Sequence, residues 1–128
     1  MKNVKKTILD ILKKSVDENI TVSYADSNNT NFPRISYYLV YHGKLALSNK
    51  KHKDTFLYQI DYFSLVPLDI ETDKNLNAMY SGLEDKFCIS EWNENVEVDV
   101  DEDYSIYHYY MEARIWVVCL DLIHSAKT

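Results

Sequence analysis

Residues 56–63 decide the fold, and they read Phe56-Leu57-Tyr58-Gln59-Ile60-Asp61-Tyr62-Phe63. Aromatic and aliphatic side chains occupy both alternating sets of positions, apart from Gln59 and Asp61. Successive side chains of a strand point to opposite faces of a sheet, so both faces of this strand are largely apolar. A strand that is apolar on both faces is typical of the middle of a sheet. We therefore expect residues 56–63 to form the central strand, which ends before Pro67.

Two shorter strands are expected before the central strand. Residues 20–24 alternate in polarity and run into a polar loop at 26–31. Pro33 begins the next strand, 35–41, because a proline at the strand entry removes no hydrogen bond from the middle of the sheet. Gly43 is expected to break this strand. The lysine-containing residues 44–54 are then expected to form a long loop.

Two amphipathic helices are predicted, one before and one after these strands in the sequence. In the N-terminal segment, apolar side chains recur at a helical period, at Val4, Ile8, Ile11, Leu12 and Val16. Packing on a sheet is favoured over lying on a membrane, because this apolar face is narrow and carries no Trp or Phe. Asp69 or Thr72 is expected to cap the second helix. Gly82 would allow that helix to pack closely against the sheet.

The last part of the chain is predicted to be a hairpin of strands. Residues 89–92 and the alternating valines of 96–100 precede an acidic turn at 101–103, and residues 104–120 form the longest strand. The order is helix, three strands, helix, two strands. It predicts an α+β fold, a mostly antiparallel sheet with two helices packed on one face. Residues 1–124 are expected to form a single domain and residues 125–128 a frayed C-terminal tail.

The composition excludes several classes of protein. The chain has 128 residues, with eleven Tyr but only two Gly and two Pro, so a glycine-rich phosphate-binding loop is not expected. No apolar run reaches the roughly 18–20 residues that cross a bilayer. The basic N-terminus is followed by charged residues and by no small-residue cleavage site, so export through a signal peptide is not expected. Tyrosine is frequent in strands and at protein–protein interfaces.

The charge is divided unevenly along the chain. Residues 1–53 carry ten basic and four acidic side chains, a balance of +6, whereas residues 54–128 carry four basic and sixteen acidic ones, a balance of −12. The net charge of −6 argues against tight nonspecific binding of nucleic acid. A subunit with one basic and one acidic part could, however, associate head to tail with its own copies.

The sequence offers no convincing catalytic or cofactor site, and we expect neither an enzyme nor a bound cofactor or metal. The four histidines lack a short metal-ligand spacing. The acidic run 99–103 lacks the glycine and the distal glutamate of a calcium loop, and a solvated hairpin tip or a contact with a partner is favoured instead. Cys119 is predicted on an apolar strand face and Cys88 at the end of a helix, where the dipole disfavours a thiolate.

Two stretches resemble the tail-terminator (tail-completion) proteins of long-tailed bacteriophages. Members of that family have a Phe-Pro-x-Ile-type strand entry, similar to residues 32–37 here, Phe-Pro-Arg-Ile-Ser-Tyr. They also have a Tyr-x-Ile-Asp-aromatic-Ser-like strand, similar to residues 58–64, Tyr-Gln-Ile-Asp-Tyr-Phe-Ser. The resemblance extends over about residues 3–120, but the acidic segment 96–104 and the segment 44–54 have no counterpart in the family pattern.

The resemblance implies a non-enzymatic structural protein of the virion tail, assembled in the host cytoplasm. Such proteins form a ring, usually a hexamer, on the head-proximal end of the tail tube, where they stop tube growth and dock to the head connector (neck) protein. DNA passes through the ring without sequence-specific binding, and no membrane is involved.

Subunit or tail-tube contacts are expected in the lysine-containing and acidic segments, at Lys44, Lys50, Lys51, Lys53, Glu97, Asp99, Asp101, Glu102 and Asp103. In another placement, the acidic segment lines the channel and repels passing DNA. A different class of function also fits the sequence, that of a small intracellular adaptor or inhibitor that binds one partner through a tyrosine-rich sheet.

Overall fold

The computed structural model describes residues 3–26, 31–48, 51–99 and 104–120, with the side chains of residues 51, 99 and 118–120 left aside. The elements run in the order α1 (Val4–Ser15), β1 (Thr21–Tyr24), β2 (Arg34–Ala46), β3 (Lys51–Ser64), α2 (Lys74–Glu84), β4 (Cys88–Ile89), β5 (Asn93–Asp99) and β6 (Tyr104–Leu120). The predicted terminal tail, 125–128, lies outside the described residues.

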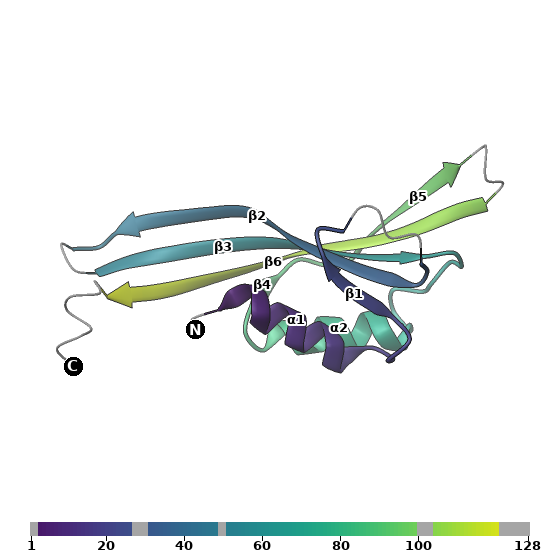
Figure 1. The fold of residues 1–128 in the computed structure, drawn as a ribbon, viewed down its shortest axis with the longest axis horizontal. Helices are drawn as coiled ribbons and strands as arrows, with labels where there is room; N and C mark the ends of the chain where they lie inside the picture. Colours follow the sequence, from purple (N-terminus) through teal and green to yellow (C-terminus); the bar gives the residue numbers. More distant parts are fainter. Residues whose placement is uncertain (1–2, 27–30, 49–50, 100–103, 121–128) are drawn as a thin grey trace.

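The strands form one sheet in the order β1-β2-β3-β6-β4, and β5 also pairs with β6. Among the strands of the described residues, β1 and β2 are the only parallel pair, and every other pair is antiparallel. Both helices lie on the same face of the sheet (Figure 1). The α+β fold predicted from the sequence is confirmed, and so is the central position of residues 56–63 within β3.

The core lies between this helix-covered face and the two helices. Tyr58, Ile60 and Tyr62 of β3 point into it, together with Leu12 of α1 and Leu83 of α2. The intervening β3 residues 57, 59, 61 and 63 therefore point to the opposite side, which we call the open face. Burial of these apolar side chains contributes about 25 cal/mol for each Å² removed from water, which makes the helix–sheet contact the main stabilising feature of the fold.

The first turn of each helix is fixed by a capping side chain. Asn3 caps α1 by accepting a hydrogen bond from the backbone N–H of Lys6. Asp73 caps α2 and accepts from the N–H of Leu76 at 3.0 Å. The prediction that Asp69 or Thr72 caps α2 is therefore wrong. The Asp69 carboxylate instead accepts from the N–H of Glu71 and closes the turn that precedes the helix.

Gly82 brings the two helices together. A Cβ atom at this position would lie 2.9 Å from Ile11 Cγ2 and 3.0 Å from Ser15 Oγ of α1. The glycine therefore permits close packing of α2 against α1, rather than against the sheet as the sequence suggested. Because the nearest contact is the branched methyl of Ile11, any larger side chain would push the helices apart.

Three predicted strand boundaries are wrong. Gly43 does not end β2, and residues 44–54 do not form a long loop, because Lys44 pairs with Asp54 and Leu45 with Lys53 in the β2–β3 ladder. The strand predicted at 89–92 is reduced to Cys88–Ile89. Cys88 consequently lies in a strand and not at the end of a helix.

Tyr109 connects the sheet to the segment before α2. Its ring is fully buried, and its hydroxyl donates to the Leu68 carbonyl at 3.0 Å and accepts from the Leu68 N–H at 2.7 Å. Burial, together with the nearby Glu94 carboxylate, raises the pKa of Tyr109 to about 12. One side chain therefore satisfies both backbone groups of a loop residue.

Replacing Tyr109 by Phe is expected to lower the free energy of unfolding by about 1–3 kcal/mol, because both half-buried backbone groups of Leu68 lose their partner. The raised pKa favours the neutral hydroxyl in the folded state, so its contribution is present below about pH 10 and is lost as the pH rises toward 12. Urea unfolding at pH 7 and at pH 11 measures both effects. The exposed Tyr41→Phe serves as control, and an equal loss in the two variants would contradict this role of Tyr109.

Candidate assembly surfaces

The sheet is longer than the helices that cover it, and it projects beyond them at both ends (Figure 1). One end, which we call the arm, consists of residues 41–46 of β2, 51–57 of β3 and 114–120 of β6. The other end, the acidic hairpin, consists of β5 and residues 104–110 of β6. Because opposite parts of the same strand, β6, form these two ends, they lie far apart within one subunit.

The open face of the arm carries an exposed group of aromatic, aliphatic and cationic side chains. Tyr41, Leu45 and Trp116 are 57%, 59% and 47% exposed. The Lys53 ammonium lies 5.1 Å from the centre of the Trp116 ring, and the Arg114 guanidinium lies 6.0 Å from it. Tyr, Trp and Arg are the residues most enriched among energetically dominant interface contacts. This group is suited to contact a protein surface that supplies negative charge.

Gly43 allows Tyr41 to lie flat on the arm. A Cβ atom at residue 43 would overlap the hydroxyl and the ring of Tyr41. The glycine thus has a structural role inside β2, since the ring of its neighbour covers the position where its side chain would be. This arrangement keeps a large aromatic surface at the open face of the arm.

The helix side of the arm carries two histidines around one carboxylate. His42 Nε2 lies 3.8 Å from Asp54 Oδ1, and His52 Nε2 lies 3.6 Å from Asp54 Oδ2. The His42 ring also stacks on Phe56 with 4.4 Å between centroids. Among the side chains that the structure describes, no group of three His, Cys, Asp or Glu residues is placed to hold a metal ion.

The acidic hairpin exposes valines and glutamates along β5. Val98 is 70% exposed, Val96 is also exposed, and Glu94 and Glu97 are on the surface beside them. By sequence, residues 93–99 and 104–110 contain no Lys or Arg. The hairpin is therefore an apolar strand edge with negative charge, whereas the arm is an apolar surface with positive charge.

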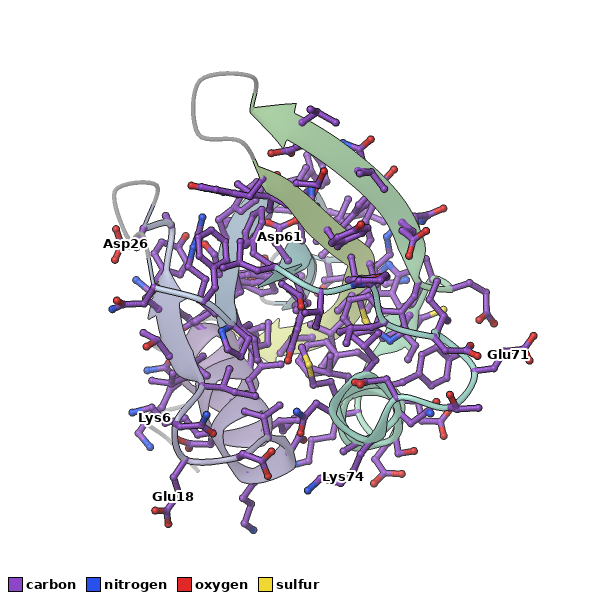
Figure 2. All side chains as sticks on the ribbon, turned by 90° about the vertical axis from the view of Figure 1, so that its right-hand side faces the viewer. Lys6, Glu18, Asp26, Asp61, Glu71 and Lys74 are labelled. Carbon is purple, nitrogen blue, oxygen red and sulfur yellow. The ribbon has the colours of Figure 1, made fainter. Side chains whose placement is uncertain are left out.

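A buried polar cluster connects the acidic hairpin to the middle of the open face. Asp61 is only 5% exposed, and its Oδ1 accepts from Gln59 Nε2 at 2.8 Å and lies 2.7 Å from His108 Nε2. The other ring nitrogen of His108 lies 3.7 Å from Glu97, and its ring stacks on Phe63. In Figure 2 Asp61 lies among the strands, whereas Glu71 points outward. The cluster holds β5 and β6 in a fixed position relative to β3.

A hollow of about 560 Å³ lies next to this cluster, between β1, β2 and β3. Arg34 lines it, with its guanidinium 4.1 Å from the Phe63 ring centre. Burial lowers the pKa of Arg34, and the nearby carboxylates of Asp26 and Asp61 oppose that effect. Because two carboxylates and one guanidinium line the hollow, its charge favours neither an anion nor an acidic peptide.

The structure separates the charged residues predicted as contacts into two groups. Lys44 lies on β2 and Lys53 on β3, both in the arm, whereas Glu97 lies on β5 in the acidic hairpin. Lys51 and Asp99 occupy strand ends, at the start of β3 and the end of β5. The remaining predicted contacts lie outside the described residues, namely Lys50, Asp101, Glu102 and Asp103.

The outer edges of β2 and β5 have no partner strand over much of their length within the described part of the chain. β1 pairs with β2 only from Arg34 to Tyr37. The next outward backbone group, the Leu39 N–H, donates to the Tyr24 hydroxyl at 3.2 Å. Beyond it, the only described strand that pairs with residues 41–46 is β3. β5 likewise pairs only with β6 among the strands that the structure describes. Unpaired edges of this kind are templates for pairing with another strand.

Comparison with known proteins adds no assignment, since no family model matches the chain and no curated protein matches it. Neither of the helices described here is long and apolar enough to span a membrane.

Proposed function

We propose that this protein is the tail-terminator subunit of a long-tailed bacteriophage, which forms a ring on the head-proximal end of the tail tube. One structural observation supports the ring. The two projecting ends of the sheet carry exposed apolar side chains and opposite charge, on the arm and on the acidic hairpin. A subunit whose two ends differ in this way forms heterologous contacts with its own copies.

Heterologous contacts produce either an open filament or a closed ring. The resemblance at residues 32–37 and 58–64 favours the ring, because tail terminators form a ring on the end of the tail tube. From the size of a 15.1 kDa subunit we expect a ring about 70–100 Å across. The tail-tube protein would contact one side of the ring and the head-connector protein the other, and DNA would pass through the channel.

The proposal assigns no catalytic step to the protein. Its work is to end tube polymerisation and to provide a docking surface in the virion tail, after assembly in the host cytoplasm. In the placement that we favour, the acidic hairpin contacts a neighbouring subunit. In the other placement it lines the channel, where negative charge would keep DNA from adhering.

Tail-tube polymerisation in the presence of the protein tests this function. We expect tubes to stop growing and to carry a cap at one end only, as seen by electron microscopy. Tubes that grow equally long with and without the protein, and that carry no cap, would contradict the proposal. Binding of a single unrelated partner by a monomer would then favour the small adaptor or inhibitor.

A further inference from the structure

We propose that β2 of one copy adds to β5 of the next copy as an antiparallel strand, so that one sheet continues through the ring. This inference rests on the proposed ring and specifies the contact that closes it. The occupant of each free edge is therefore a second copy of this chain. Strand addition at an exposed edge supplies backbone hydrogen bonds, and the side chains supply the selectivity.

The charges of the two edges favour this pairing over pairing of like edges. Two β2 edges placed side by side would bring Lys44 near its copy, and two β5 edges would bring Glu94 and Glu97 near theirs. Like charges across a strand pair are destabilising, whereas opposite charges stabilise it. Pairing of two β2 edges or of two β5 edges is thus unfavourable, whereas a β2 edge and a β5 edge are complementary in charge. This difference selects head-to-tail association.

The faces of the strands match when the sheet continues with its helix side unchanged. Lys44 pairs with Asp54, and β3 residues 54, 56 and 58 share the helix side. On β5, Glu94 and Val96 face Tyr109 and Tyr107 on that same side. Glu97 faces Ile106 and lies on the open face, as Tyr41 does. Across the new strand pair, residues of the helix side therefore meet residues of the helix side, and residues of the open face meet residues of the open face.

The spacing of these residues defines the register. On the free edge of β2, Tyr41 and Lys44 are three ladder steps apart, since they pair with Leu57 and Asp54. Glu94 and Glu97 are also three positions apart on β5. An antiparallel alignment brings Lys44 opposite Glu94 and Tyr41 opposite Glu97 at the same time. A parallel alignment cannot satisfy these two pairs together.

Disulfide formation between variants that each carry one added cysteine tests this register in the full-length chain. Two variants carry the cysteine on β2, Tyr41→Cys and Lys44→Cys, and two carry it on β5, Glu94→Cys and Glu97→Cys. Each β2 variant is mixed with each β5 variant, with and without tail tubes, and oxidised. Cysteines bridge only when their Cα atoms lie within about 7 Å and their side chains share a face. The native cysteines are present in all four mixtures, which makes these mixtures matched controls for one another.

We expect at least about a tenfold higher yield of covalent dimer from the two matched mixtures, 44 with 94 and 41 with 97, than from the two mismatched ones. Equal yields in all four mixtures, or a higher yield from the mismatched ones, would overturn the strand pairing. Rings that form without matched cross-links would overturn the strand pairing alone and leave the proposed function standing. Matched cross-links in a protein that never caps tubes would overturn the proposed function and leave the strand pairing standing. The absence of both rings and cross-links would overturn the strand pairing and the proposed function together.

Discussion

Reversing the charge of the arm with Lys44→Glu and Lys53→Glu is expected to weaken ring formation by about 100-fold or more. The substitutions place negative charge on the arm, with residue 44 opposite Glu94 and residue 53 one strand further in, on the open face that also carries Glu97. Like charges across an interface cost several kcal/mol, where each 1.4 kcal/mol is a factor of ten. Both lysines lie in the arm, and Lys44 is exposed, so the fold itself should be little affected. Analytical ultracentrifugation over a range of protein concentrations measures the change.

A second charge reversal in the same chain is expected to rescue ring formation. Adding Glu94→Lys and Glu97→Lys to the reversed arm restores opposite charge between the arm and the acidic hairpin, and assembly should return to within about tenfold of the original. Because Glu97 lies near His108, thermal unfolding of the hairpin variant alone serves as the stability control. Failure of the rescue in a correctly folded four-site variant would contradict contact between the arm and the acidic hairpin.

The second large effect concerns stability, and it compares a leucine of the core with a leucine of the arm. Leu83→Ala is expected to lower the free energy of unfolding by about 2–5 kcal/mol, because Leu83 is fully buried between the helix and the sheet. Leu45→Ala removes the same atoms from the exposed arm and should change it by no more than about 0.5 kcal/mol. Urea unfolding at a dilution where the protein is monomeric measures both values.

In an assembly assay the ranking of the two leucine variants should be reversed, with the larger effect for Leu45→Ala. Leu45→Ala removes apolar surface that the arm offers to a neighbour, so we expect weaker association without loss of fold. A large stability loss for Leu45→Ala in the monomer would instead indicate that the arm packs within its own subunit. That result would remove the main reason to regard the arm as a contact surface.

Helices and strands in which apolar residues recur at a regular period could be predicted from the sequence, because the local spacing of apolar residues determines which face is buried. The helix at Val4–Ser15 and the central strand follow directly from apolar spacing. The outer parts of β2 and β3 could not be predicted, since lysines interrupt the pattern and the strands exist there because β2 pairs with β3 and β3 pairs with β6. The start of α2 was ambiguous because Asp69, Thr72 and Asp73 are all suitable capping residues.

The candidate surfaces could be predicted in part. The uneven charge of the chain indicates a basic and an acidic contact region, and Lys44, Lys53 and Glu97 do lie in two separate projecting ends. The contribution of Trp116 could not be predicted, because only the three-dimensional pairing brings it beside Lys53. The contact of Asp61 with His108 joins residues 47 positions apart, and no local motif indicates it.

The central claim is that copies of this chain close into a ring in which the arm of each subunit contacts the acidic hairpin of the next. Cryo-electron microscopy of capped tail tubes tests it most directly. We predict a closed ring at one tube end, with β2 of every subunit continuous with β5 of its neighbour. Single copies bound to the tube, or a ring in which both projecting ends point into solvent, would contradict the claim.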